Sequence, residues 1–393
     1  MQIERDLASV ADSSPQESPS PAGVHQSFSD SLITEEERKA EARQARAEWR
    51  DTMTLDAAER ARRVRLFENR SDDFLAVSIN IPITTCNYRC NYCFLNHEVK
   101  PDLTKLEKLP AIIDRLARIP RPLGVTLGPW GEILAVPKMW PLLGQAARLP
   151  NVVHVETWTN LSRDPELLFE HIDPKKLCII GTYHPTEFKS FEADNETFFA
   201  RVTRIKDLVR DISINFVICE ENLPFVEQAR QRFAELGVYF TVNPQINSQN
   251  GYGVKIRPVT RDEKTLTREM LDNEFLDFFF TQNRKANVRC TTGRDMIDVN
   301  WEGNVTRCEH LSQTTDPAEL LGNILDPEGP FIDVVSRYCN GLGCACKSTI
   351  GYAEPFVEKY KRFGTQHKFH RRAPGEVGTH SYDPVTLGGA NSG

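Results

Sequence analysis

The sequence lacks an excess of positive charge. Its 393 residues contain 48 Lys and Arg against 55 Asp and Glu, which gives a formal net charge of -7. Proteins that bind nucleic acid phosphates generally carry a basic field, so general nucleic acid binding is not expected. The chain also lacks an apolar run long enough to cross a bilayer, and its start, MQIERDLASV, has no apolar signal-peptide core. These absences predict a cytoplasmic protein that does not bind membranes.

Cysteine, by contrast, is present and clustered. Of ten cysteines, three lie between residues 86 and 93 and five between residues 290 and 346, while Cys178 and Cys219 stand alone. In a long chain without a signal sequence, clustered cysteines indicate metal binding or catalysis more often than disulfides.

Composition divides the chain into five parts. Residues 1–32 include the Ser/Pro-rich tract SPQESPSPAG, which cannot bury enough apolar surface to order itself, so we expect disorder. Residues 33–72 are rich in Ala, Glu and Arg and are predicted to be helical. We expect the main domain at 73–250, a cysteine-rich extension at 251–363 and a flexible tail at 364–393.

Strand-like runs recur along the main domain. FLAVSINIPITT, LGVTLG, VVHVETW, LCIIGTY, ISINFVIC and VYFTVN are apolar and β-branched, and helical patterns separate them at the spacing of βα units. This spacing predicts six parallel strands. A helix is expected after each of the first five, and the pattern does not decide whether one follows the sixth. The predicted fold is α/β, a partial (β/α)6 TIM-like barrel with a C-terminal extension. In such folds the chemistry lies on loops that leave the C-terminal ends of the strands.

Three cysteines follow the first predicted strand directly. Cys86, Cys90 and Cys93 form the pattern C-x3-C-x2-C, with Tyr92 just before the last of them. A four-iron cluster held by three thiolates keeps one iron open to a small molecule. Two alternatives fit the same thiols: a zinc site completed by His97, or a ferredoxin-like cluster with a distant fourth cysteine.

This spacing, with an aromatic residue in this place after the first strand of a partial barrel, resembles the radical S-adenosylmethionine (radical SAM) superfamily. The resemblance covers residues 75–350. It implies that the amino and carboxylate groups of SAM bind the open iron of a 4Fe-4S cluster. It further implies that an electron from the reduced cluster cleaves SAM to a 5'-deoxyadenosyl radical, and that a flavodoxin or ferredoxin supplies electrons.

The resemblance also implies SAM-binding residues after successive strands. The segment LGPWGE resembles the Gly-Gly-Glu segment of the superfamily, although Trp130 replaces its first glycine. The alternatives are a glycine-rich turn for this segment, a commonplace loop asparagine after the third strand, and a structural histidine after the fourth. The residues given this role are Tyr92, Gly131, Glu132, Thr159, Asn160, His184 and Asn215.

Cys219 ends the fifth predicted strand. It shares strand parity with Asn215, so both side chains project to one face. A thiol can donate a hydrogen atom, as a radical SAM epimerase requires, and Cys219 is therefore a candidate catalytic residue. The alternative is that it serves as a small buried hydrophobic residue. Cys178, at the start of the fourth strand, is predicted to be core.

The C-terminal cysteines suggest a second metal site. CTTGRDMIDVNWEGNVTRC and the LGNI that follows resemble the SPASM and twitch extensions of radical SAM enzymes. DMIDVNWEGNVTRC also has the pattern of a β-hairpin around an EGN turn, which would bring Cys290 and Cys308 towards one another. We expect one auxiliary 4Fe-4S cluster, with a four-cysteine zinc site as the alternative. The candidate ligands are Cys290, Cys308, Cys339, Cys344 and Cys346.

Together these features predict an enzyme that abstracts a hydrogen atom from a small polar substrate, such as a sugar, an aminocyclitol or another natural-product intermediate. The outcome would be epimerisation or dehydrogenation, with the cluster extension covering the barrel mouth. One alternative is maturation of a ribosomally made peptide, although the first 70 residues offer no strands for a leader-binding domain. The other is a non-catalytic iron-sulfur or zinc protein.

Overall fold

The computed structural model describes residues 62–93, 95, 97–244, 246–248, 254–256, 289–308, 320–338 and 352. The chain divides into two units, Met1–Gln44 and Ala45–Gly393, and every described residue belongs to the second. The predictions for residues 1–32 and 364–393 lie outside the described residues. No helix among the described residues is long and apolar enough to span a membrane.

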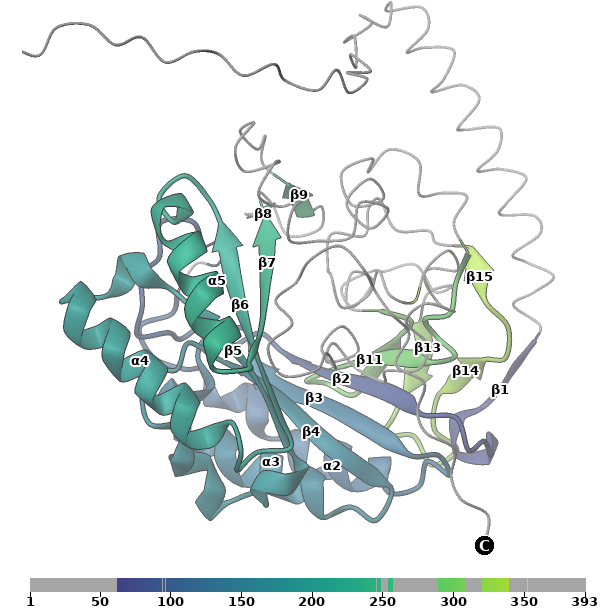
Figure 1. Cartoon of the computed structure of the whole chain (residues 1–393). Helices are drawn as coiled ribbons and strands as arrows, with labels where there is room; N and C mark the ends of the chain where they lie inside the picture. The colour runs from purple at the N-terminus through teal and green to yellow at the C-terminus, as the bar shows by residue number, and fades with distance from the viewer. Residues whose placement is uncertain are drawn as a thin grey trace, which may run out of the picture. The chain divides into compact units, whose positions relative to one another are not determined.

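A nine-stranded sheet in the order β13-β12-β11-β2-β3-β4-β5-β6-β7 forms the centre of the fold (Figure 1). The six predicted strands are confirmed as consecutive parallel neighbours, and among the described strands the order does not close, as a partial barrel requires. Their bounds are β2 (Leu75–Ile81), β3 (Leu123–Pro129), β4 (Val152–Thr159), β5 (Leu177–Tyr183), β6 (Asp211–Ile218) and β7 (Tyr239–Pro244).

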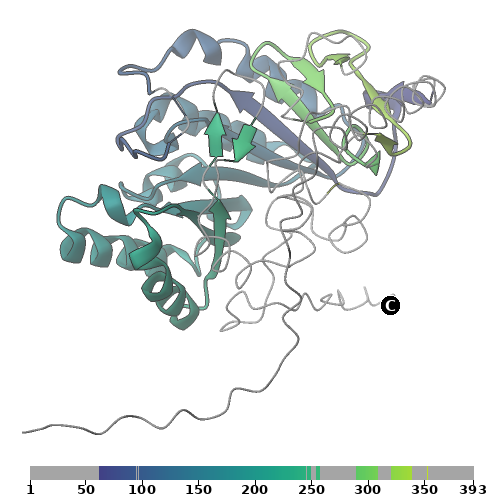
Figure 2. The ribbon, with the colours of Figure 1, turned by 90° about the horizontal axis from the view of Figure 1, so that it is seen from above.

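The core lies between this sheet and the helices. Alternate residues of the strands, such as Val77 and Ile79 of β2 and Val125 of β3, are buried in one apolar cluster with the inner faces of the helices. The helices cover one side of the sheet in both views (Figures 1 and 2). They are α2 (Leu109–Leu116), α3 (Trp140–Arg148), α4 (Phe191–Ile205) and α5 (Val226–Glu235).

The connection between β4 and β5 differs from the prediction, because it contains no α-helix. It consists of two 3-10 helices, η5 (Pro165–Glu170) and η6 (Pro174–Lys176), each with a proline in its first turn. An aspartate caps each one: Asp164 accepts from the N–H of Glu166, and Asp173 accepts from the N–H of Lys175. A proline cannot donate the backbone hydrogen bond of a helix interior, so Pro174 prevents the first helix from continuing.

The predicted helix over residues 33–72 is wrong for residues 62–72, and residues 33–61 lie outside the described residues. The observed elements are β1 (Arg63–Arg65) and the 3-10 helix η1 (Leu66–Glu68). β1 pairs antiparallel with β14 (Phe331–Asp333). Leu66 is fully buried in the core. Long-range pairing and burial therefore override the helical preference of the local composition.

The predicted C-terminal hairpin is confirmed, but it extends the barrel sheet. β11 (Met296–Asn300) pairs antiparallel with β12 (Asn304–Thr306), and β12 pairs with β13 (Leu320–Asn323). β11 also pairs in parallel with β2, so the hairpin and β13 extend the main sheet beyond β2 (Figure 2). Two small antiparallel pairs complete the described strands: β8 (Ile246–Ser248) with β9 (Val254–Ile256), and β10 (Arg289–Cys290) with β15 (Arg337–Tyr338).

Candidate functional site

The three-cysteine loop starts where β2 ends, and the end of β3 holds it in place. The N–H of Gly131 donates to the carbonyl of Ile83 at 2.9 Å, and the N–H of Glu132 donates to the carbonyl of Thr85 at 2.9 Å. These bonds continue the β2–β3 pairing up to Cys86. The thiols of Cys86, Cys90 and Cys93 are all free and partly buried.

Gly131 allows this close approach. A Cβ at residue 131 would lie 2.1 Å from the carbonyl oxygen of Thr85 and 2.8 Å from the carbonyl carbon of Thr84. Both neighbours are backbone atoms, which cannot move away as a flexible side chain can. The glycine predicted to contact SAM therefore also lets the end of β3 pack against the start of the cysteine loop.

Glu132 is buried, and its carboxylate binds protein groups. It accepts hydrogen bonds from the hydroxyl of Thr159 at 2.6 Å, the N–H of Asn160 at 2.5 Å and the N–H of Leu134 at 2.9 Å. Removal from water raises the pKa of the Glu132 carboxyl. With these partners, Glu132 and Thr159 position the end of β4. These bonds occupy the Glu132 side chain, whereas the predicted SAM contact of this segment is through its backbone and stays a prediction.

Asn160 joins the end of β4 to the cysteine loop. Its amide Nδ2 donates to Asn87 Oδ1 at 3.0 Å and lies 3.8 Å from the sulfur of Cys86. Its Oδ1 accepts from the N–H of Ser162, whose hydroxyl accepts from Asn87 Nδ2 at 2.8 Å. Hydrogen bonds to ligand sulfurs are among the factors that set cluster potentials. The amide of Asn160 is thus placed to donate a hydrogen bond to the sulfur of Cys86.

His184 lies against the cysteine loop. Its Nδ1 is 2.8 Å from the hydroxyl oxygen of Tyr92 and 3.6 Å from the sulfur of Cys90. The rings of Tyr92 and His184 stack with centroids 5.9 Å apart, and the ring of Tyr88 meets the same imidazole edge-on. Desolvation lowers the pKa of His184 to about 4, so the imidazole is neutral at neutral pH. These contacts hold Tyr92 and His184 against the loop, and the predicted contact of each with SAM stays a prediction.

The zinc alternative stays open, because the buried Nε2 of His97 has no hydrogen-bond partner in the described part of the chain. Nδ1 of His97 lies 2.9 Å from the carbonyl oxygen of Thr84. Within the described ranges, no group of three or more His, Cys, Asp and Glu side chains is arranged to hold a metal ion. Zinc would need its ligands about 2.0–2.3 Å from one ion. In a four-iron cluster the thiolates bind separate irons, so this close convergence is not required.

The side of the sheet opposite the helices is polar. Asn80, Ser213 and Asn215 are buried there, and Thr241 pairs in register with Asn215. Nδ2 of Asn80 and the hydroxyl of Ser213 have no hydrogen-bond partner in the described part of the chain. Buried polar atoms normally have partners, so this face suits a polar ligand. Asn80 and Ser213 were not among the predicted site residues. A signal was present, because the tripeptide Ser-Ile-Asn occurs in both β2 and β6 and places its two polar residues on one face of the strand.

Cys219 directly follows β6 and is completely buried. Its carbonyl accepts from the N–H groups of Asn222 and Leu223 at 3.0 and 3.1 Å. Burial, together with a hydrogen bond from the thiol to Glu221, raises the pKa of Cys219 to about 12. The thiol is therefore protonated at neutral pH. Cys178 is buried near the start of β5, as predicted.

The described C-terminal cysteines lie at the other end of the sheet. Cys290 packs against Ala76, Met296 and Tyr352, and β11 begins level with Ala76 near the start of β2. Cys308 is buried just after β12, which runs back towards that same end. With a rise of about 3.3 Å per residue, the stretch from Ala76 to Ile81 spans about 17 Å. These two cysteines therefore lie away from the barrel mouth, and most of the extension expected to cover it lies outside the described residues.

Three further candidate ligands, Cys339, Cys344 and Cys346, lie outside the described residues. One hollow, between α4 and α5, is lined by Glu196, Phe199 and Arg232 among others. It lies on the helical side of the fold and contains none of the predicted site residues. The cysteine loop and the polar side of the sheet therefore remain the candidate site.

No family model matches the chain, and no curated protein matches it. Three similar solved structures are anSMEcpe with bound AdoMet and the Cp18Cys peptide, Streptococcus suis SuiB bound to S-adenosylmethionine, and BtrN in complex with AdoMet and 2-DOIA. Their identities are 16%, 13% and 14%, with TM-scores of 0.44, 0.42 and 0.33. The matches cover 64%, 66% and 64% of this chain, and 78%, 65% and 78% of the other chains. At such values the similarity does not determine activity or substrate.

Proposed function

We propose that this chain is a radical SAM enzyme. The observation that supports this most directly is the loop of Cys86, Cys90 and Cys93, three free and partly buried thiols at the C-terminal end of the first parallel strand. Three thiolates suit a 4Fe-4S cluster with one open iron, where SAM would bind. With SAM bound, the reduced cluster would supply a 5'-deoxyadenosyl radical. A flavodoxin or ferredoxin is the proposed electron donor.

The chain's own residues would hold and shield the cluster loop. The N–H of Tyr88 donates to the sulfur of Cys86 at 3.4 Å, and Asn160 approaches the same sulfur. His184 is placed beside Cys90. Burial raises the pKa of each loop thiol, so the thiols bind metal with loss of protons. Gly131 and Asn215, with Asn160, are the proposed SAM contacts.

The proposed substrate is a small polar molecule, such as a sugar, an aminocyclitol or another natural-product intermediate. The buried polar side chains Asn80 and Ser213 support this proposal, because they offer hydrogen bonds on the side of the sheet opposite the helices. Abstraction of a hydrogen atom would lead to epimerisation or dehydrogenation. In an epimerisation, the thiol of Cys219 would return the hydrogen atom.

A second cluster is proposed near the start of β2. Cys290 and Cys308 are its described ligands, and Cys339, Cys344 and Cys346 are the sequence candidates for the rest. Because this place is remote from the cysteine loop, we assign the auxiliary 4Fe-4S cluster a structural or electron-transfer role.

The test is SAM cleavage by anaerobically reconstituted protein with dithionite, followed by chromatography for 5'-deoxyadenosine. We expect the parent protein to release it. Cys93→Ala should abolish release, because only two thiolates remain in the loop. Cys178→Ala is the matched control, since this buried thiol lies at the other end of its strand. An iron-loaded parent that releases no 5'-deoxyadenosine would refute the proposal and leave a non-catalytic iron-sulfur protein.

A further inference from the structure

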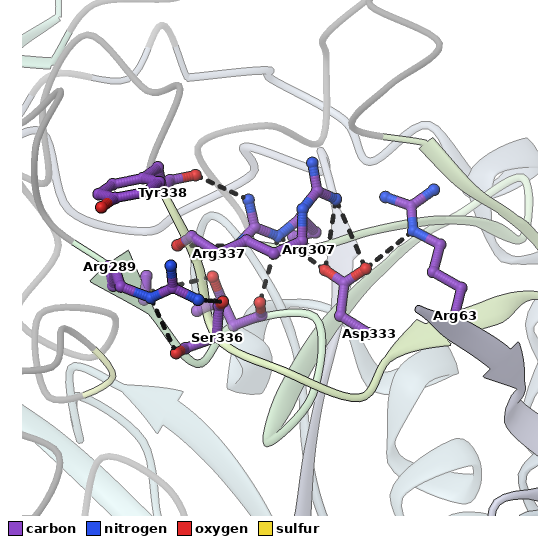
Figure 3. A network of polar contacts seen from close by, with 9 residues as sticks. Arg63, Arg289, Arg307, Asp333, Ser336, Arg337 and Tyr338 are labelled. Atoms are coloured by element: carbon purple, nitrogen blue, oxygen red, sulfur yellow. Dashed lines mark hydrogen bonds and ion pairs between the residues drawn. The ribbon is translucent and has the colours of Figure 1, made fainter. Parts of the chain in front are cut away.

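A buried ionic network joins Arg63, Arg307, Asp333 and Arg337 (Figure 3), and Arg307 directly precedes Cys308 in the sequence. Both Asp333 and Arg307 are about 1% exposed, and Arg337 is fully buried. Nε of Arg307 lies 3.0 Å from a carboxylate oxygen of Asp333, and Nη1 of Arg337 lies 3.5 Å from both oxygens. Arg63 of β1 donates from Nε to the same carboxylate at 2.8 Å.

Arg307 also bonds the backbone of two other segments. Its Nε donates to the carbonyl of Thr292 at 3.2 Å, and its Nη1 donates to the carbonyl of Tyr338 at 3.2 Å. Arg307 directly precedes Cys308, Thr292 lies two residues after Cys290, and Tyr338 ends β15. One guanidinium thus connects three segments that are distant in the sequence. Such multiple bonding depends on the planar fork of arginine.

Asp333 connects two of the same segments through its backbone. Its N–H donates to the carbonyl of Gly293 at 2.8 Å. Gly293 has a φ of +91°, and a Cβ there would lie 2.5 Å from the Asp333 carboxylate. The turn after Cys290 is therefore shaped to fit this aspartate.

The pair β10–β15 strengthens the connection. Cys290 pairs with Arg337, and Arg289 pairs with Tyr338. The side chain of Arg289 donates to the hydroxyl and the carbonyl of Ser336. The segment of Cys290 is thus hydrogen-bonded to the strand that ends just before residue 339.

We propose that Arg307 and Asp333 are positioning residues that align the segments of Cys290 and Cys308 for one shared cluster. This inference rests on the proposed auxiliary cluster. Metal ligands from separate segments must be brought together. If those segments are not ordered beforehand, the entropy cost of ordering them reduces the free energy of metal binding. A fully bonded buried network supplies that order before metal arrives. Removal of one partner from such a network is strongly disruptive, because the remaining charges stay buried.

The test uses the full chain with Cys86, Cys90 and Cys93 changed to Ala, so that only the auxiliary site can bind iron. We expect this parent to hold about four irons after anaerobic reconstitution. Arg307→Lys keeps the charge but cannot bond both backbone segments, and it should lower bound iron at least five-fold. Arg204→Lys, at an exposed ion pair with Asp164 and Glu166, is the matched control and should have no effect.

A second measurement separates positioning from general unfolding. In the chain with all cysteines, Arg307→Lys should lose the auxiliary cluster and keep the N-terminal one, seen as about half the iron with an intact electron paramagnetic resonance signal of the SAM-perturbed cluster. Asp333→Asn, which leaves the buried arginines without their shared carboxylate, should give at least as large a loss of auxiliary iron. Loss of both clusters together would assign Arg307 a purely structural role and overturn the inference.

The outcomes distinguish this inference from the proposed function. If the parent without the N-terminal thiols binds no iron, the auxiliary cluster itself is refuted, and the inference with it. If that parent binds iron and Arg307→Lys binds the same amount, only the positioning role is refuted.

Discussion

Cys219 combines complete burial with a place at the C-terminal end of β6, the same end of the sheet as the cysteine loop. Its pKa of about 12 keeps the sulfur as S–H at neutral pH, which is the form that can donate a hydrogen atom. These properties make the residue suited to the donor role proposed for it.

We expect Cys219→Ala to stop epimerisation while 5'-deoxyadenosine still forms, because abstraction does not require the thiol. The measurement is mass spectrometry of the product after turnover in heavy water, where the parent should incorporate one deuterium. Cys178→Ala is the matched control, since it makes the same change at a buried thiol elsewhere in the sheet. Unchanged deuterium incorporation in Cys219→Ala would show that another group donates.

At the scale of single residues, strand parity predicted which side chains share a face. Asn215 does lie on the polar side of the sheet, in register with Thr241. The partners of Glu132 were beyond prediction, because its hydrogen bonds join the end of β3 to the end of β4. Such contacts depend on the three-dimensional approach of two loops, and one sequence carries no signal of it.

At the scale of elements, the fit between the end of β3 and the cysteine loop depends on Gly131. Gly131→Ala should lower the free energy of unfolding by about 1–3 kcal/mol, the usual cost of overpacking, because the new methyl group meets the rigid backbone of Thr85. It should also lower occupancy of the N-terminal cluster. Urea unfolding of the metal-free protein and iron analysis of the reconstituted protein measure the two effects.

The matched control is Gly128→Ala, within β3 and three residues before Gly131. A Cβ there would lie 3.1 Å from the hydroxyl of Thr157, a side-chain atom, and 3.9 Å from the nearest backbone nitrogen. The smaller conflict predicts a smaller loss of stability. Equal losses at the two glycines would mean that the backbone contact at Thr85 has no special cost.

The elements themselves were predictable to different degrees. The six parallel strands were evident because each is a buried β-branched run bounded by polar loops. β1 was missed because its three residues obtain their stability from β14, more than 260 residues later. The 3-10 helices after β4 had a usable signal in Pro165 and Pro174, each preceded by an aspartate.

At the scale of the whole described fold, one continuous sheet joins the strand before the cysteine loop to the hairpin before Cys308, while Cys290 lies in the separate pair β10–β15. The hairpin β11–β12 continues the sheet beyond β2, so the predicted boundary at residue 250 does not separate two independent cores. Val299 and Val305 of the hairpin belong to the same apolar cluster as Val77 of β2. The shared core becomes evident only from the parallel pairing of β11 with β2. This pairing joins segments about 220 residues apart in the sequence, and local sequence patterns do not encode it.

The two cysteine groups lie at opposite ends of β2, which leads to a prediction about their independence. Cys290 is near Ala76 at the start of β2, and Cys86 follows the end of β2. The two cysteines are therefore separated by about 17 Å along the direction of the strand. Cys290→Ala should reduce iron from about eight to about four atoms per chain, and 5'-deoxyadenosine release should stay within about two-fold of the parent. Iron analysis and chromatography on the same preparation measure both.

The partly exposed position of Cys290 makes this variant milder for folding than a change at the buried Cys308. A folded Cys290→Ala protein with four irons that no longer cleaves SAM would contradict independence, and would mean that electrons reach the N-terminal cluster through the auxiliary one. Retained cleavage with loss of substrate oxidation would instead assign the auxiliary cluster to the removal of an electron from the substrate radical.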